Sequence, residues 1–210
     1  TPTGETGANL FTVRELDWFC KNAYNLGIKH MDHWDLAQIL RLFKSCLALT
    51  IYYPGTIPAE HAADIALRTM LCNFVVASGL TAFARARDNV TDQAQEYRDL
   101  RRQVVVFDEE LQRQRVSLSA SLLADLKLKL GALMVFDFEA ALHLEEWDAL
   151  GEIVRRTAFC ESSQPLKRMA DCLLRVGAPP QGRFIPLLPF SCLQCRAFLR
   201  RGSCSVLLNP

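Results

Sequence analysis

Glycine is scarce in this chain, and the motifs that depend on glycine are missing. Only 10 of the 210 residues are glycine, and none of them form a cluster. The sequence contains no glycine-rich phosphate loop, no Gly-x-Ser-x-Gly motif and no recognisable Ser/His/Asp grouping. These absences argue against phosphate-loop nucleotide binding and against catalysis through an activated nucleophile.

The chain also lacks an excess of charge of either sign. Lysine and arginine total 24 and aspartate and glutamate total 23, which gives a formal net charge of +1. Nucleic-acid-binding proteins usually carry a basic excess, so a DNA-contacting helical module is the least favoured alternative. An apolar content of 50% with 22% charged residues indicates a folded chain with a sizeable core.

Sustained alternation of apolar and polar residues, the pattern of β-strands, is absent too. Apolar residues recur instead at steps of three and four, and Thr12 and Glu15 have the spacing of a capping box. Asp32 or Asp35 starts the second helix. The sequence therefore predicts an all-α protein of about seven helices, near residues 13–30, 35–52, 59–87, 91–111, 119–144, 147–159 and 165–176.

Three parts are expected along the chain: a flexible lead-in over 1–11, a helical repeat region over 12–180 and an irregular, proline-containing tail over 181–210. The most apolar stretch, residues 71–83, is too short to span a membrane, and the start shows no secretory signal. Because the first residue is Thr, we expect the chain to be a piece of a longer protein.

Residues 135–153 indicate how the helices pack. Small residues such as Ala140 and Gly151 alternate there with bulky ones such as Phe138 and Trp147 at helical spacing. Small residues let two helices approach closely, and hairpins of such helices bury their apolar faces by stacking on one another. We therefore predict a tetratricopeptide-like α–α superhelix, which presents a surface to other proteins rather than a pocket for chemistry.

The cysteines and histidines do not predict a metal site. Five of the eight cysteines fall on apolar helical positions, where a free thiol acts as a small buried hydrophobe. Cys192, Cys195 and Cys204 have part of the spacing of a zinc site, but a fourth ligand is missing. The His and Asp residues of 30–35 are explained by the preferences of these residue types for helix ends. We predict neither a metal nor a cofactor.

Residues 88–96 give the strongest indication of an enzyme. They resemble the second metal-binding motif of terpenoid synthases, all-helical enzymes in which side chains four residues apart hold magnesium. Asp92 stands where that motif wants Ser or Thr, and no partner motif of the Asp-Asp-x-x-Asp type occurs. A helix N-cap followed by a polar face is the simpler interpretation. A magnesium-dependent enzyme of the terpenoid-synthase type remains the alternative function.

Several stretches, in order along the chain, resemble one family of meiotic proteins. Residues 15–26 (ELDWFCKNAYNL) are similar to its opening segment, and residues 85–90, 136–150 and 169–180 are similar to its following helices. The family is the fungal meiosis- and sporulation-specific Zip-four/Spo-twenty-two-like family of tetratricopeptide-type scaffolds. The resemblance covers about residues 12–180.

This resemblance implies a non-catalytic scaffold for protein–protein interaction on meiotic chromosomes in the nucleus. Such a scaffold promotes crossover recombination and assembly of the synaptonemal complex. The implied partners are other meiotic recombination and chromosome-axis proteins, with no membrane, small-molecule substrate or direct nucleic-acid contact. No catalytic residues come with the family.

Aromatic residues at the ends of the predicted helices are the candidate partner-binding residues. Partner helices commonly dock between stacked helices through apolar anchors at helical spacing. Packing between helices is the competing role for each ring, since aromatic side chains dominate protein cores. The candidates are Trp34, Tyr52, Tyr53 and Trp147.

Overall fold

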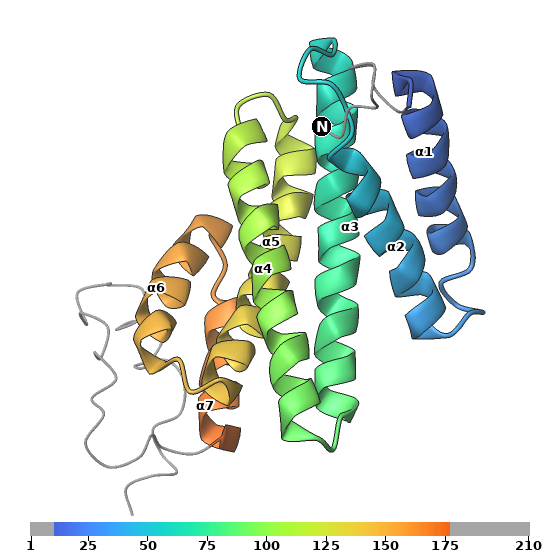
Figure 1. The fold of residues 1–210 in the computed structure, drawn as a ribbon. Coiled ribbons are helices and arrows are strands. Elements are labelled where there is room, and N and C mark those ends of the chain that lie inside the picture. Colours follow the sequence, from blue (N-terminus) through green and yellow to red (C-terminus); the bar gives the residue numbers. More distant parts are fainter. Residues whose placement is uncertain (1–10, 177–210) are drawn as a thin grey trace, which may run out of the picture.

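The structure, a computed structural model, describes residues 11–176, and every regular element in that range is a helix (Figure 1). The predicted all-α class and the seven α-helices are confirmed for these residues. The predicted tail, with Cys192, Cys195 and Cys204, and all of the lead-in except Phe11 lie outside the described residues. The elements are α1 (Val13–Lys29), α2 (Leu36–Thr50), α3 (Ala59–Ala86), α4 (Val90–Gln114), α5 (Ala120–His143), α6 (Trp147–Thr157), the 3-10 turn η1 (Ala158–Cys160) and α7 (Gln164–Val176).

Side-chain caps explain where several helices begin. Thr12 and Glu15 form the predicted capping box: Thr12 N–H donates to Glu15 Oε2 at 2.8 Å, and Glu15 N–H donates to Thr12 Oγ1 at 3.3 Å. Asp35 caps α2 and Asn89 caps α4, each accepting a hydrogen bond from a backbone N–H of the first turn. These bonds satisfy donors that the helix itself leaves unpaired.

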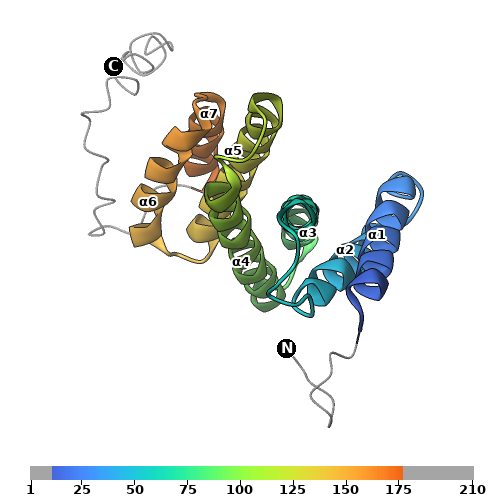
Figure 2. The same ribbon diagram turned by 90° about the horizontal axis from the view of Figure 1, so that it is seen from above.

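The helices follow one another as roughly antiparallel neighbours (Figure 1). Each helix contacts the next one along the chain, and α5 also contacts α3 and α7. Seen from above, α2, α4 and α6 form one row and α3, α5 and α7 the other (Figure 2). The apolar core therefore runs along the array, between the two rows, and includes buried side chains from every helix.

Glycine permits close helix contacts, but not at the position that the sequence indicated. A Cβ atom on Gly27 would lie 2.8 Å from Cε2 of Phe43, so α1 and α2 meet where only a hydrogen atom fits. No atom of the described residues lies within 4 Å of a Cβ placed on Gly151, and the prediction of close packing at that residue is wrong. Ala140, from the same predicted hairpin, is fully buried as expected.

Helix α3 is longer and more continuously apolar than the 71–83 stretch considered in the sequence. By length and composition alone it could cross a membrane, and more than half of its apolar stretch is buried inside the structure. It lies between α2 and α4 and contacts both (Figure 2). A helix with neighbours on opposite sides needs apolar residues around most of its circumference, so packing accounts for this composition.

Ion pairs between helices supplement the apolar core from α3 to α6. In each pair an arginine guanidinium donates to a carboxylate that is mostly or fully buried, which satisfies a charge that would be costly to bury alone. The pairs are Arg85–Glu139 (α3 to α5, 2.8 Å), Arg101–Asp137 (α4 to α5, 2.7 Å) and Arg156–Asp108 (α6 to α4, 2.9 Å).

Candidate partner-binding surface

Trp34 lies in the turn between α1 and α2, where the backbone and a neighbouring ring hold it in place. His30 is the C-cap residue of α1, and its carbonyl accepts a hydrogen bond from Trp34 N–H at 3.0 Å. The imidazole of His30 stacks on the indole, with ring centroids 4.4 Å apart and planes 10° from parallel. The indole is still 38% exposed, so a positioned aromatic surface faces the solvent.

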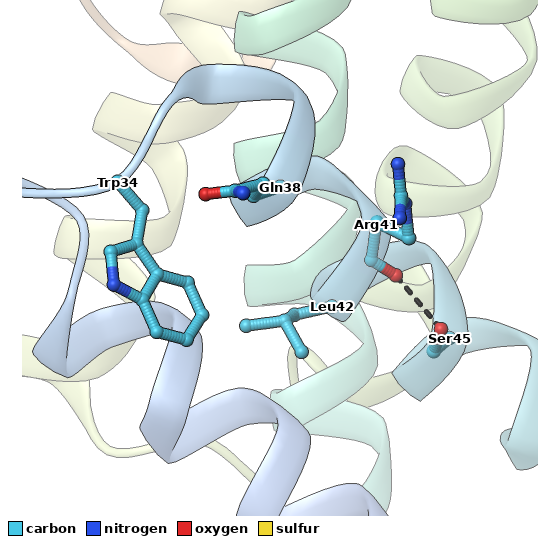
Figure 3. Close-up of a pocket in the computed structure, with 5 residues that line it drawn as sticks. All are labelled: Trp34, Gln38, Arg41, Leu42 and Ser45. Atoms are coloured by element: carbon cyan, nitrogen blue, oxygen red, sulfur yellow. Dashed lines mark hydrogen bonds between the residues drawn. The ribbon is translucent and has the colours of Figure 1, made fainter.

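A surface hollow of about 400 Å³ adjoins this indole (Figure 3). Trp34 and Leu42 point toward one another across it and supply its apolar walls (Figure 3). Three residues of α2 complete the lining: Gln38, Arg41 and Ser45. The Ser45 hydroxyl is occupied locally, since it donates to the backbone carbonyl of Arg41 at 2.8 Å. The hollow thus combines an apolar wall with one cationic side chain, and we call it the Trp34 hollow.

A second aromatic group lies at the other end of α2, where α1 begins. Phe11 contacts Phe19 and Tyr52 edge-on, with ring centroids 6.1 and 6.2 Å apart. Trp18 contacts Phe19 at 5.2 Å and is 62% exposed. Trp18 and Phe19 were not predicted, because the prediction covered only aromatic residues at the ends of helices. Their positions off the buried stripe of Leu16 and Cys20 could have revealed them.

Tyr53 is almost fully buried and makes a structural hydrogen bond. Its hydroxyl donates to Oδ1 of Asp17 at 2.7 Å, and His61 Nε2 lies 2.7 Å from the other carboxylate oxygen. Burial alone would raise the pKa of Asp17. The hydrogen bonds from His61 and Tyr53 and the charge of Lys21 outweigh burial, so the pKa lies below its usual value. Tyr53 therefore joins α1 to the start of α3 and does not present its ring to a partner.

Trp147 is also a packing residue. It is the first residue of α6, is 7% exposed and belongs to the core formed with α5. Its indole Nε1 is buried and has no hydrogen-bond partner within residues 11–176. Of the four predicted anchors, only Trp34 and Tyr52 retain exposed surface. These two lie at opposite ends of α2, so the structure does not bring the candidates together in one site.

A second hollow, also of about 400 Å³, crosses the surface where α2, α3 and α4 adjoin. Its lining is mixed, and the Asp99 and Arg102 side chains in it pair with each other. Asp99 and Arg102 therefore offer little free charge to a ligand, and the cation of this lining without an ion pair in 11–176 is Lys44. The remaining lining residues are Lys44, Leu47, Ala48, Thr50, Thr69, Asn73, Leu80, Gln103 and Val106.

The segment that resembles a magnesium motif forms the start of α4. Asn89 accepts a hydrogen bond from Thr91 N–H at 2.9 Å, so the N-cap interpretation is confirmed. Glu96, farther along the same face, lies 3.4 Å from Arg87. Within residues 11–176 no group of three or more His, Cys, Asp or Glu side chains is arranged to hold a metal ion. No observation on these residues favours the terpenoid-synthase alternative.

The five cysteines of the described helices are free and buried, as expected for small apolar side chains. The thiols of Cys20 and Cys46 point at each other's backbone carbonyls, at 3.7 and 3.6 Å. Burial raises the pKa of Cys160 to about 11, which keeps this thiol protonated at neutral pH.

Comparison with known proteins adds no family to this description. No family model, no curated protein and no solved structure matches the chain.

Proposed function

We propose that this chain is a non-catalytic scaffold for protein–protein interaction, built as a tetratricopeptide-like superhelix. The support is the order of helix contacts: each helix contacts the next one along the chain, and α5 also contacts α3 and α7. Stacked helical hairpins with this order of contacts form extended surfaces, and such surfaces commonly bind partner helices or peptides.

The observation that carries the proposal is the uneven distribution of exposed apolar side chains. Of the 14 large apolar side chains that are exposed in residues 11–176, 8 lie between Trp18 and Ile51. Concentrated exposed apolar surface is typical of interaction sites. These eight are Trp18, Phe19, Leu26, Ile28, Met31, Trp34, Leu36 and Ile51.

The test is affinity capture with the full-length protein from the cells that express it. We compare the native chain with a double variant, Trp18→Ala with Trp34→Ala, and with a control, Leu174→Ala. Leu174 is 82% exposed on α7, away from the α1–α2 hairpin. The native chain and the control should capture the same partners, and the double variant should lose them. Identical capture by all three proteins, or no specific capture, would contradict the proposal.

The biological setting that we propose is meiosis: a nuclear protein on meiotic chromosomes that promotes crossover recombination and synaptonemal complex assembly. This part rests only on the resemblance of the quoted segments to the Zip-four/Spo-twenty-two-like family. Its proposed partners are meiotic recombination and chromosome-axis proteins. Capture from meiotic cells should recover such proteins, and imaging should place the chain in the nucleus. Expression restricted to non-meiotic cells would contradict this setting and leave the scaffold proposal standing.

A further inference from the structure

Three of the four carboxylates of the α1–α2 hairpin form hydrogen bonds, and the fourth, Asp32, is exposed in the turn between the helices with no partner in 11–176. Glu15 belongs to the capping box, Asp35 caps α2 and Asp17 accepts from Tyr53. Four basic side chains of the same hairpin form no ion pair with any residue in 11–176: Arg14, Lys29, Arg41 and Lys44. With Lys21 included, the hairpin carries five basic side chains against four carboxylates, so it presents a small excess of positive charge.

Arg41 is the one of these cations that lines the Trp34 hollow. Arginines deeper in the array, such as Arg85 and Arg101, pair with carboxylates on neighbouring helices. Arg41 instead lies beside the apolar wall of Trp34 and Leu42 with its guanidinium unpaired in the described chain. A carboxylate is the natural complement, because the planar guanidinium forms two parallel hydrogen bonds with it.

We infer that the Trp34 hollow binds an acidic peptide segment of a partner protein, an inference that rests on the proposed scaffold function. An aliphatic or aromatic side chain of the peptide enters the hollow between Trp34 and Leu42, and a neighbouring carboxylate pairs with Arg41. The stacking of Trp34 on His30 restricts the indole before binding, which lowers the entropy lost on association. Tryptophan and arginine are also the residue types that most often dominate binding energy at interfaces.

Charge favours this occupant over a second copy of the same chain. A two-fold symmetric contact centred on the Trp34 hollow would bring Arg41 of one copy close to Arg41 of the other. Like charges placed together at an interface oppose association, whereas an acidic segment is attracted to the same surface. The attraction should weaken with added salt, since exposed charges are screened.

The test begins with a random 16-residue peptide library displayed against the full chain. Enriched peptides should carry a net negative charge and at least one large apolar residue. In fluorescence anisotropy with these peptides, Arg41→Glu should weaken binding about five- to ten-fold and Trp34→Ala about thirty-fold. The matched control is Arg98→Glu, an exposed arginine of α4 without an ion-pair partner in 11–176, which should leave affinity unchanged.

Several results would overturn the inference. Enrichment of neutral or basic peptides, or no enrichment at all, would do so, as would equal effects of Arg41→Glu and Arg98→Glu. A dimer that Trp34→Ala dissociates, detected by light scattering, would assign the hollow to a second copy. In each case, capture of the same cellular partners by the native chain and by Arg41→Glu would leave the scaffold proposal intact. Absence of any specific capture by the native chain would contradict both the scaffold proposal and the peptide-binding inference.

Discussion

Gly79 on α3 lies directly against Leu40 on α2: a Cβ atom built on Gly79 would be 2.6 Å from Cδ2 of Leu40 and 2.9 Å from its Cγ. Leu40 is itself 2% exposed, so its side chain has little room to move aside. The contact between these two helices therefore depends on the absence of a side chain at one position.

Gly79→Ala should destabilise the fold. Overpacking of a tight core costs about 1–3 kcal/mol, and the better helix propensity of alanine returns about 1 kcal/mol. We expect a net loss of up to about 2 kcal/mol by urea unfolding. The matched control is Gly151→Ala, where no atom in 11–176 lies within 4 Å of the new Cβ and propensity alone should stabilise α6. Equal effects of the two substitutions would show that α2 and α3 can move apart without cost.

The contrast between these glycines also shows what the sequence could predict about the fold. Helix positions followed from local signals, because caps such as Thr12 and Asn89 and the three- and four-residue apolar steps act within one helix. Which small residue mediates a close contact depends on the partner helix, and a single sequence carries no direct signal for it. Gly151 and Gly79 look alike in the sequence and differ completely in their surroundings.

Two neighbouring carboxylates on α5 should respond to pH in opposite directions. Burial raises the pKa of Asp137 above its usual value, and Arg101 only partly opposes this. Burial also acts on Glu139, but the hydrogen bonds and charge of Arg85 outweigh it and lower the pKa. A lowered pKa contributes stability that is present above the unfolded-state value and lost as pH falls through the folded-state value. A raised pKa has the opposite effect on stability: the free energy of unfolding increases as pH falls through the folded-state pKa.

Glu139→Gln should therefore cost about 1–2 kcal/mol at pH 7, and this cost should disappear in acid as the native Glu139 becomes protonated. Asp137→Asn should cost less at pH 7, and the native protein should gain stability relative to this variant as pH falls. Urea unfolding of the three proteins between pH 7 and pH 3.5 measures both differences. If both differences change with pH in the same direction, the assigned environments are wrong.

Trp147 allows its packing role to be separated from its polar group. Removing a large buried side chain, Trp147→Ala, should cost about 3–5 kcal/mol. Trp147→Phe should cost far less, because it retains most of the apolar ring and removes a buried N–H that has no partner in the described part of the chain. Trp18→Ala, at a ring that is 62% exposed, should cost less than about 1 kcal/mol. A loss below about 1 kcal/mol for Trp147→Ala would instead restore the partner-binding role predicted from the sequence.

The candidate surface was only partly predictable for a related reason. Aromatic rings at helix ends are used both for packing and for binding, and sequence does not separate the two uses. Trp34 remains exposed because its turn projects it over α2, whereas Tyr53, close beyond the other end of α2, reaches Asp17 instead. The mutual placement of Trp34, Leu42 and Arg41 depends on the path of that turn and became visible only in the structure.

The buried thiols should be unreactive in the folded protein. Burial raises the pKa of Cys160 to about 11 and that of Cys172 above its usual value, and only the thiolate reacts readily. A variant with Cys192, Cys195 and Cys204 replaced by serine isolates the five cysteines of the helices. A thiol reagent at pH 8 should label none of them within minutes under native conditions and all five in urea. Rapid native labelling would indicate that these helices open readily.

Tyr53→Phe tests whether the hydroxyl bond to Asp17 stabilises the junction of α1, α2 and α3. The variant removes a 2.7 Å hydrogen bond to a carboxylate, while the ion pairs of Asp17 with Lys21 and Arg68 and its contact with His61 Nε2 remain. We expect a loss of about 1–2 kcal/mol at pH 7 and a higher pKa of Asp17 by NMR titration. Because the pKa of native Asp17 is lowered, the stability that it contributes is lost as pH falls through that value. The difference between native and variant should therefore shrink toward pH 3.

Tyr52→Phe is the control, since Tyr52 contributes a ring contact with Phe11, and it should change neither the stability nor the pKa of Asp17. A loss for Tyr53→Phe that is equal at pH 7 and pH 3 would mean that the ring, rather than the hydroxyl bond, holds this junction together.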